Sequence, residues 1–72
     1  MIILINLNVQ KLLDEKGKTR YWLVKELDSN YETINRLCDN LSTAIYLETI
    51  EKLCNALECR PNELFIIERN QN

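Results

Sequence analysis

The sequence contains no histidine, one glycine and one proline among its 72 residues. An all-β fold needs many tight turns, and glycine and proline form most of them, so their scarcity argues against that class. Without histidine and without a Cys-x-x-Cys pair, the chain lacks the clustered ligands of a zinc site. It also lacks a glycine-rich phosphate loop and a nucleophile-and-base pair. We therefore expect no enzyme activity, no metal and no cofactor.

Cysteine is present but sparse, at Cys38, Cys54 and Cys59. An odd number of scattered thiols fits a reducing cytoplasm better than a disulfide framework. Free cysteine is among the residues most often buried. We interpret these three as small apolar packing residues.

Long hydrophobic runs are also missing. The apolar start, MIILINLNV, is interrupted by Asn6 and Asn8 and has no basic segment before it. It is too short to span a membrane and does not have the layout of a signal peptide. We expect a cytoplasmic protein that forms one domain over residues 1–72. A core this small has to be efficient or supplemented by a partner.

The net charge of −2 does not by itself favour a nucleic-acid binder, but the charges are unevenly distributed. Acidic residues dominate the second half of the chain, as in Glu48, Glu51, Glu58, Glu63 and Glu68. Basic residues cluster earlier, at Lys16, Lys18, Arg20 and Lys25. This basic edge serves either solubility or phosphate binding.

Apolar residues at helical spacing indicate a mostly helical domain. The spacing predicts helices over residues 9–16, 19–27, 31–39 and 47–57, and a short fifth helix that begins at Pro61 and turns Leu64 and Phe65 inward. Residues 40–46 have no such stripe and are expected to form a loop. The apolar runs 1–5 and 65–67 are expected to pair as two short strands.

Small polar residues mark the expected helix ends. Gly17 stands where a helix end needs positive φ. Thr19 and Asn30 are expected to cap the second and third helices, and Asn6 and Asn8 are candidate caps of the first.

Three stretches carry a resemblance at residue level: LLDEKGKTRYWLVKEL, NYETINRLCDN and LETIEKLCNALECRPNELF. Together they resemble the Cro/CI-type (XRE-type) helix-turn-helix family of phage and bacterial repressors. The resemblance covers about residues 7–66, with the helix-turn-helix at about 19–39. It implies an all-α fold, a five-helix DNA-binding domain, to which the pairing expected from the two apolar runs adds two short strands.

The resemblance also implies a function. Members of this family are sequence-specific transcriptional regulators, and we expect a repressor that binds the major groove of double-stranded DNA. One small domain reads few bases, so a homodimer is expected, with no small-molecule effector. Its interface would be the end of the last two helices or the terminal strands, which carry Ile2, Leu4, Phe65 and Ile67.

The DNA-contacting residues follow from the same resemblance, position by position. Thr19 and Arg20 begin the helix that supports the recognition helix. The recognition helix contributes Asn30, Tyr31, Glu32 and Thr33 in its first turn, and Asn35 and Arg36 one turn later. Asn40 and Ser42 lie in the following loop, where the DNA backbone is contacted. These side chains suit base and phosphate recognition.

The chain departs from the family pattern at several positions. Asp28 replaces the usual glycine of the turn, and aspartate tolerates left-handed geometry better than most residues. Ser29 replaces the usual apolar turn residue, Glu58 a helix-ending glycine, and Arg60 a serine-like cap. The loop DNLSTAI carries no basic residue, and each missing phosphate contact weakens DNA binding.

A second function stays open on the same fold. Tyr21, Trp22 and Tyr31 are aromatic residues near the turn. Trp22 stands where the family commonly has the Glu or Gln of a capping box, and it lies off the apolar stripe of its helix. An aromatic residue in that place is either part of the core or part of a protein interface. The alternative is therefore an antitoxin-like or anti-repressor interaction module.

Overall fold

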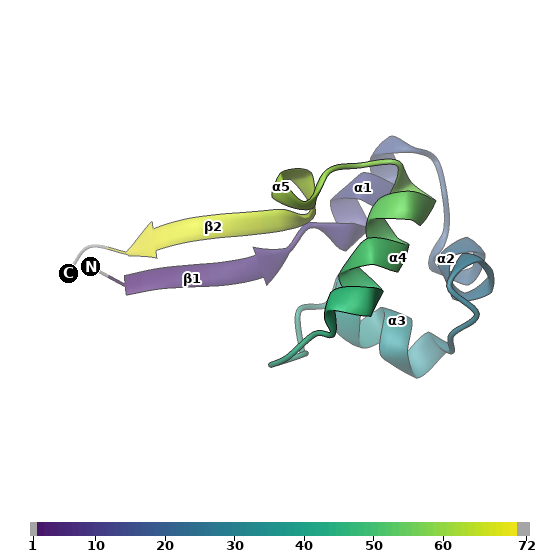
Figure 1. Cartoon of the computed structure of the whole chain (residues 1–72), viewed down its shortest axis with the longest axis horizontal. Helices are drawn as coiled ribbons and strands as arrows, with labels where there is room; N and C mark the ends of the chain where they lie inside the picture. Colours follow the sequence, from purple (N-terminus) through teal and green to yellow (C-terminus); the bar gives the residue numbers. More distant parts are fainter. Residues whose placement is uncertain (1, 71–72) are drawn as a thin grey trace.

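Five short helices and a two-stranded antiparallel sheet make up the structure, a computed structural model that describes residues 2–70. The elements in chain order are β1 (Ile2–Leu7), α1 (Val9–Glu15), α2 (Arg20–Glu26), α3 (Tyr31–Cys38), α4 (Leu47–Leu57), α5 (Pro61–Leu64) and β2 (Phe65–Asn70). The helices gather at one end, and the two strands project from them as an arm (Figure 1). This is the expected five-helix architecture with two paired strands, β1 and β2. No helix between residues 2 and 70 has the length and apolar character that crossing a bilayer requires.

The core lies between the helices and is built from the predicted stripes. Its largest fully buried side chains are Leu13, Leu23, Ile34, Leu53, Leu57, Leu64 and Val9. Each helix thus contributes at least one residue that no water reaches. The helical spacing of Leu47, Ile50, Leu53, Cys54 and Leu57 predicts one buried stripe on α4. For Leu47 this was wrong, because it is 78% exposed. It is the first residue of α4, and the residues of the stripe pack against the core only from Ile50 onward.

Four helices end in the same way, although only one of them ends at a glycine. A residue in the left-handed conformation follows each of α1–α4, and the next backbone N–H reaches back to a carbonyl of the last turn. The left-handed residues are Gly17, Asp28, Asn40 and Glu58. The closing bonds run from Lys18 to Leu13, Ser29 to Val24, Leu41 to Arg36 and Cys59 to Cys54, at 2.9–3.0 Å. The turn predicted at Asp28 is confirmed, since its φ is 50°.

The helix starts confirm two of the expected caps. The Thr19 hydroxyl accepts a hydrogen bond from the Trp22 N–H at 3.0 Å, and the Asn30 carboxamide accepts one from the Thr33 N–H at 2.8 Å. Asn8 precedes α1, but its side chain makes no capping bond. Its backbone N–H donates to the Leu64 carbonyl at 2.7 Å instead, which joins the start of α1 to the end of α5. Asn6 lies within β1.

The terminal arm, made of β1 and β2, is longer than the sequence indicated. Each strand has six residues, and the register pairs Leu7 with Phe65, Ile5 with Ile67 and Ile2 with Asn70. Met1, expected in the first strand, lies outside the described residues. Phe65 was expected to face inward at the end of the fifth helix and also to begin the second strand. α5 ends at Leu64 and Phe65 opens β2 with extended dihedral angles, so the strand prediction is confirmed. Half-buried against the core, it still faces inward.

Candidate nucleic-acid interface

Helix α3 has one buried face and one exposed face. Its inner residues Ile34, Leu37 and Cys38 are 0%, 4% and 7% exposed, which anchors the helix to the core. The outer face carries Tyr31, Glu32, Thr33 and Arg36, all exposed. The side chains expected to read bases therefore lie on the side of α3 that faces away from the protein.

Arg36 is available for an external partner. No hydrogen bond or ion pair within residues 2–70 engages its guanidinium. Thr33 lies one turn before Arg36 on the same exposed side. Its backbone N–H donates to the Asn30 side chain, but its hydroxyl makes no hydrogen bond within residues 2–70. Such an unpaired, exposed guanidinium can make a bidentate contact with a guanine edge or a phosphate.

A shallow hollow of about 520 Å³ lies beside these residues. It is lined by Thr33 and Arg36 of α3 and by Ser42, Thr43, Ala44 and Tyr46 of the following loop. Ser42 was expected at the interface; Thr43 and Tyr46, which line the same hollow, were not singled out by the sequence. Tyr46 is 82% exposed and stands directly before α4, with its side chain outside any apolar stripe. No sequence pattern distinguishes Tyr46, because the loop 40–46 also contains Leu41, Ala44 and Ile45.

Arg20 lies in a different setting from that expected. Its Nε donates to Gln10 Oε1 at 2.7 Å, its Nη1 to Asn35 Oδ1 at 2.8 Å, and its Nη2 to Asp39 Oδ1 at 2.9 Å. The hydrogen bond to Asp39 raises the pKa of the guanidinium above its usual value, although desolvation opposes this. One side chain thus joins α1, α2 and the end of α3. The contact of Arg20 and Asn35 with DNA stays a prediction; their role in the structure is to hold the helices together.

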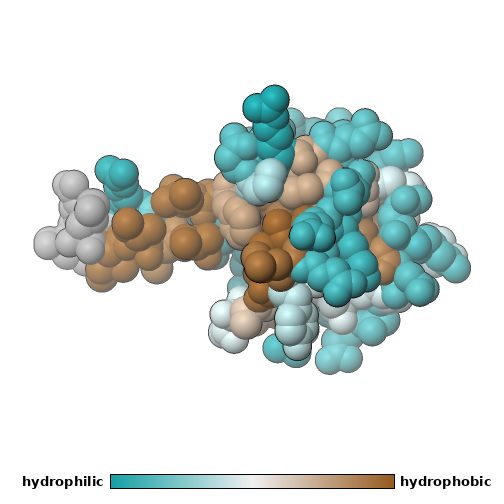
Figure 2. Space-filling model, viewed as in Figure 1, coloured by the Kyte–Doolittle hydropathy of each residue, from teal (hydrophilic) through white to brown (hydrophobic). Residues whose placement is uncertain are grey.

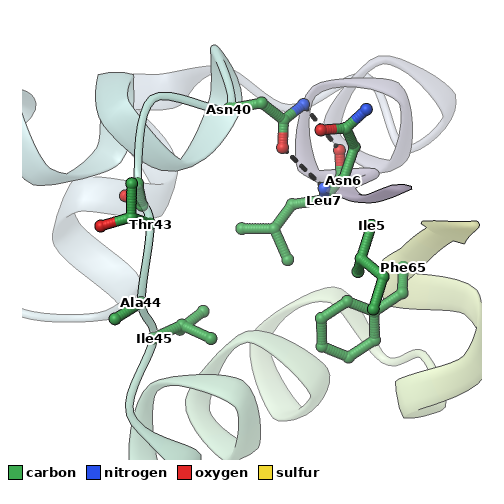
Figure 3. Close-up of a pocket in the computed structure, with 9 residues that line it drawn as sticks. Ile5, Asn6, Leu7, Asn40, Thr43, Ala44, Ile45 and Phe65 are labelled. Carbon is green, nitrogen blue, oxygen red and sulfur yellow. Dashed lines mark hydrogen bonds between the residues drawn. The ribbon is translucent and has the colours of Figure 1, made fainter. Parts of the chain in front are cut away.

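Asn40 also has an internal role. Its Oδ1 accepts from the Leu7 N–H at 2.6 Å, and its Nδ2 donates to the Leu7 carbonyl at 3.1 Å. Figure 3 shows these two bonds side by side, the carboxamide facing the strand as a second backbone would. The loop after α3 is therefore tied to β1. A contact of Asn40 with the DNA backbone also stays a prediction.

The aromatic residues near the turn form a second exposed feature. The rings of Tyr21 and Tyr31 lie 6.1 Å apart, and Lys25 Nζ lies 5.3 Å from the Tyr21 ring centroid. Trp22 is half-buried and packs against the core, with Lys18 Nζ 5.3 Å from its ring. Two lysines of the predicted basic edge thus lie over aromatic faces. Trp22 belongs mainly to the core; Tyr21 and Tyr31 are the exposed members of this group.

The three cysteines are free and act as packing residues, as predicted. Cys38 is buried and Cys54 and Cys59 are half-buried against the core. Burial raises the pKa of the Cys38 thiol. Burial, with the neighbouring Cys54 thiol, raises the pKa of Cys59 to about 11. Thiols held protonated in this way are poor nucleophiles and poor metal ligands.

Comparison with known proteins agrees with this geometry. Residues 8–70 match the sequence model of the Cro/C1-type HTH DNA-binding domain, a DNA-binding and non-enzymatic family. The crystal structure of a "putative DNA-binding protein" from Bacteroides fragilis is similar, with a TM-score of 0.79 at 27% sequence identity; the match covers 88% of this chain and 100% of that chain. A search of curated proteins gave no match. Because the family match spans nearly the whole chain, the protein belongs to the Cro/C1-type helix-turn-helix DNA-binding domain family.

Proposed function

We propose that the protein is a sequence-specific transcriptional regulator that binds operator DNA as a homodimer and represses by occupying it. The observation that carries the proposal is the outer face of α3. It presents Thr33 and the unpaired Arg36 beside a hollow, while its inner face is locked into the core. A rigid helix with free polar side chains on one side is suited to the major groove. The place of action would be the nucleoid in the cytoplasm.

The residues divide into two groups on this proposal. Tyr31, Glu32, Thr33 and Arg36 would reach base edges, and Thr19, Ser42, Thr43 and Tyr46 would contact phosphate or sugar. Arg20, Asn35 and Asn40, which have internal partners, would position the helix rather than read DNA. Asn30 would act through its cap at the start of α3, where backbone N–H groups favour a phosphate.

The proposal is tested by selecting bound DNA from a random pool, since this measures binding and returns the recognised site together. With the selected DNA, Arg36→Ala is expected to lower affinity by at least tenfold and to relax preference at one position. Arg69→Ala is the matched control, because it removes the same charge from the far strand of the arm. Failure to enrich any sequence at low salt would contradict the proposal.

A protein-interaction module remains the second candidate, because Tyr21 and Tyr31 expose about half of their surface in one paired cluster. On this reading, Tyr21→Ala removes a protein partner in a pull-down from the native host while DNA affinity stays at its non-specific level. Retention of specific DNA binding by Tyr21→Ala, with no partner lost, would count against it.

A further inference from the structure

The terminal arm exposes more apolar surface than a two-stranded sheet can bury by itself. Its exposed aliphatic side chains are Ile2, Ile3, Leu4, Ile5, Ile66 and Ile67, each 38–65% exposed. Apolar side chains cover much of the projecting arm (Figure 2). The register places Ile3, Ile5 and Ile67 on one face of the sheet and Ile2, Leu4 and Ile66 on the other, so both faces beside β1 are apolar. Together the six side chains expose on the order of 500 Å² of apolar surface. An isolated two-stranded sheet is also only marginally stable in water.

The outer edge of β1 has backbone groups ready for another strand. Leu7 uses both its N–H and its carbonyl on Asn40, so these groups point away from β2. In an antiparallel pair the direction alternates along the strand, so the groups of Ile5 and Ile3 also point outward. Within residues 2–70 these outward groups have no hydrogen-bond partner. The edge is thus closed at Leu7 and open from Asn6 to Ile2.

The two edges of the arm differ in chemistry. β1 has no charged side chain over its whole length, whereas β2 carries Glu68 and Arg69 in its outer half. Charged residues protect an edge from pairing, and an uncharged aliphatic edge invites it. The geometry therefore points to β1 as the edge that pairs.

We propose that β1 pairs with β1 of a second copy of this chain, antiparallel about a twofold axis at Leu4. Leu4 is the midpoint of the open edge, which runs from Ile2 to Asn6 and is closed at Leu7. In this register Leu4 faces its own counterpart, and Ile3 exchanges both backbone bonds with Ile5 of the second copy. A four-stranded sheet results, with β2 and its charges on both outer edges. This inference rests on the homodimer of the proposed function and names its interface.

An existing hollow fits the incoming strand. It has a volume of about 200 Å³ and lies between β1 and the loop before α4, with Ile5, Leu7, Ala44, Ile45 and Phe65 supplying its apolar lining. In Figure 3, Leu7, Ile45 and Phe65 point toward one another across it. Pairing about Leu4 places Ile3 of the second copy beside Ile5, on the face that carries Leu7 and Phe65. A hollow of roughly 150 Å³ already accommodates a benzene-sized group, so an isoleucine side chain fits.

The apolar character of the arm agrees with this occupant. Pairing along β1 covers the part of each arm's exposed apolar surface that lies beside that edge, namely Ile3 and Ile5 on one face and Ile2 and Leu4 on the other. The pairing is self-complementary, as a twofold interface must be. Because Asn40 ties the loop after α3 to β1, pairing of the arms also fixes the two recognition helices relative to each other.

Proline substitutions of two cross-strand partners test which edge pairs. Ile5 and Ile67 lie opposite each other, and both have outward N–H groups, so proline removes no bond within the arm at either position. Ile5→Pro is expected to raise the dimer dissociation constant at least tenfold in sedimentation equilibrium without DNA, and Ile67→Pro to change it less than threefold. Equal loss in both variants would indicate packing through the face of the sheet and overturn the proposal. So would a wild-type chain that is monomeric at micromolar concentration.

A cross-link tests the register and does not depend on how proline affects folding. Leu4 is a non-hydrogen-bonded position facing its counterpart, where Cα atoms are about 4.5 Å apart, within the range for a disulfide. With the three native cysteines replaced by serine, Leu4→Cys treated with oxidised glutathione is expected to give a covalent dimer. Glu68→Cys, on the opposite strand, is the control and should remain monomeric on a non-reducing gel. A dimer from Glu68→Cys alone would overturn the proposal.

The two tests leave the DNA function separately testable. If Ile5→Pro remains a dimer but Arg36→Ala loses the operator, the interface is wrong and the proposed function stands. If Leu4→Cys cross-links but no DNA sequence is enriched, the interface stands and the proposed function is wrong.

Discussion

Arg20 Nη2 lies 2.9 Å from Asp39 Oδ1, so the first residue of α2 is joined to the residue that follows α3. The same guanidinium binds Gln10 in α1 and Asn35 in α3. Side chains of Arg20 and Asp39 are 30% and 48% exposed, which weakens the ion pair by solvent screening. Its charge therefore contributes little, and its main role is to join α2 to the end of α3 through hydrogen bonds.

We expect Arg20→Ala to lower the free energy of unfolding by about 1–2 kcal/mol, because three partners lose a partly buried charged donor. Urea unfolding measures this. Asp39→Asn keeps the shape but removes the charge, and should cost less, about 0.5–1 kcal/mol. A loss of DNA affinity with unchanged stability in Arg20→Ala would instead show that Arg20 contacts DNA directly.

Asn40 combines a left-handed backbone, at φ 58°, with two bonds to Leu7. Asn40→Gly relieves the backbone but loses both bonds, so we expect stability to fall by about 1 kcal/mol. Asn40→Ala also adds backbone strain, so the free energy of unfolding should be lower by roughly a further 1 kcal/mol than in Asn40→Gly. Hydrogen exchange of the Leu7 amide is expected to speed up in both. Unchanged exchange would mean that Asn40 does not hold β1.

The left-handed residues at two helix ends are open to stabilisation. Asp28 and Glu58 have φ of 50° and 51°, where glycine pays no steric penalty. Asp28→Gly and Glu58→Gly are each expected to add about 0.5–1 kcal/mol in thermal or urea unfolding. Gly17→Ala is the converse control and should cost about 1 kcal/mol through φ alone, since an added Cβ at Gly17 meets no atom within 4 Å.

The pKa of Cys59, about 11 in the folded protein against an ordinary value of 9.0, predicts a pH dependence. The folded state holds this proton more tightly than the unfolded chain, so the contribution is complete below pH 9 and is lost as pH rises toward 11. The free energy of unfolding should therefore fall between pH 9 and pH 11. In the Cys59→Ser variant it should fall less steeply over the same range. Alkylation of Cys59 at pH 8.5 should be at least tenfold slower in the folded protein than in urea. Equal rates would contradict the shift.

Much of the helical framework followed from the sequence by itself. The period of Leu and Ile residues is a local signal, and Thr19 and Asn30 act on N–H groups only three residues away, so these helices were predictable. Asp28 was assigned to the turn from the family resemblance, in which it takes the place of the usual glycine, and aspartate is one of the residues that tolerate left-handed geometry. Trp22 could not be resolved, because its burial depends on what the other helices leave uncovered.

What only the tertiary structure decided was the use of the polar side chains. Arg20, Asn35 and Asn40 have the chemistry of DNA-contacting residues, yet their partners lie 10 to 33 positions away in the chain. Spacing along one helix says nothing about such partners. The length of the arm was underestimated for a related reason: Glu68 and Arg69 are polar, but the register with β1 continues the pairing through them. Local patterns set which helices form, because their forces act within a turn or two; long-range packing then determines which exposed groups remain free to bind.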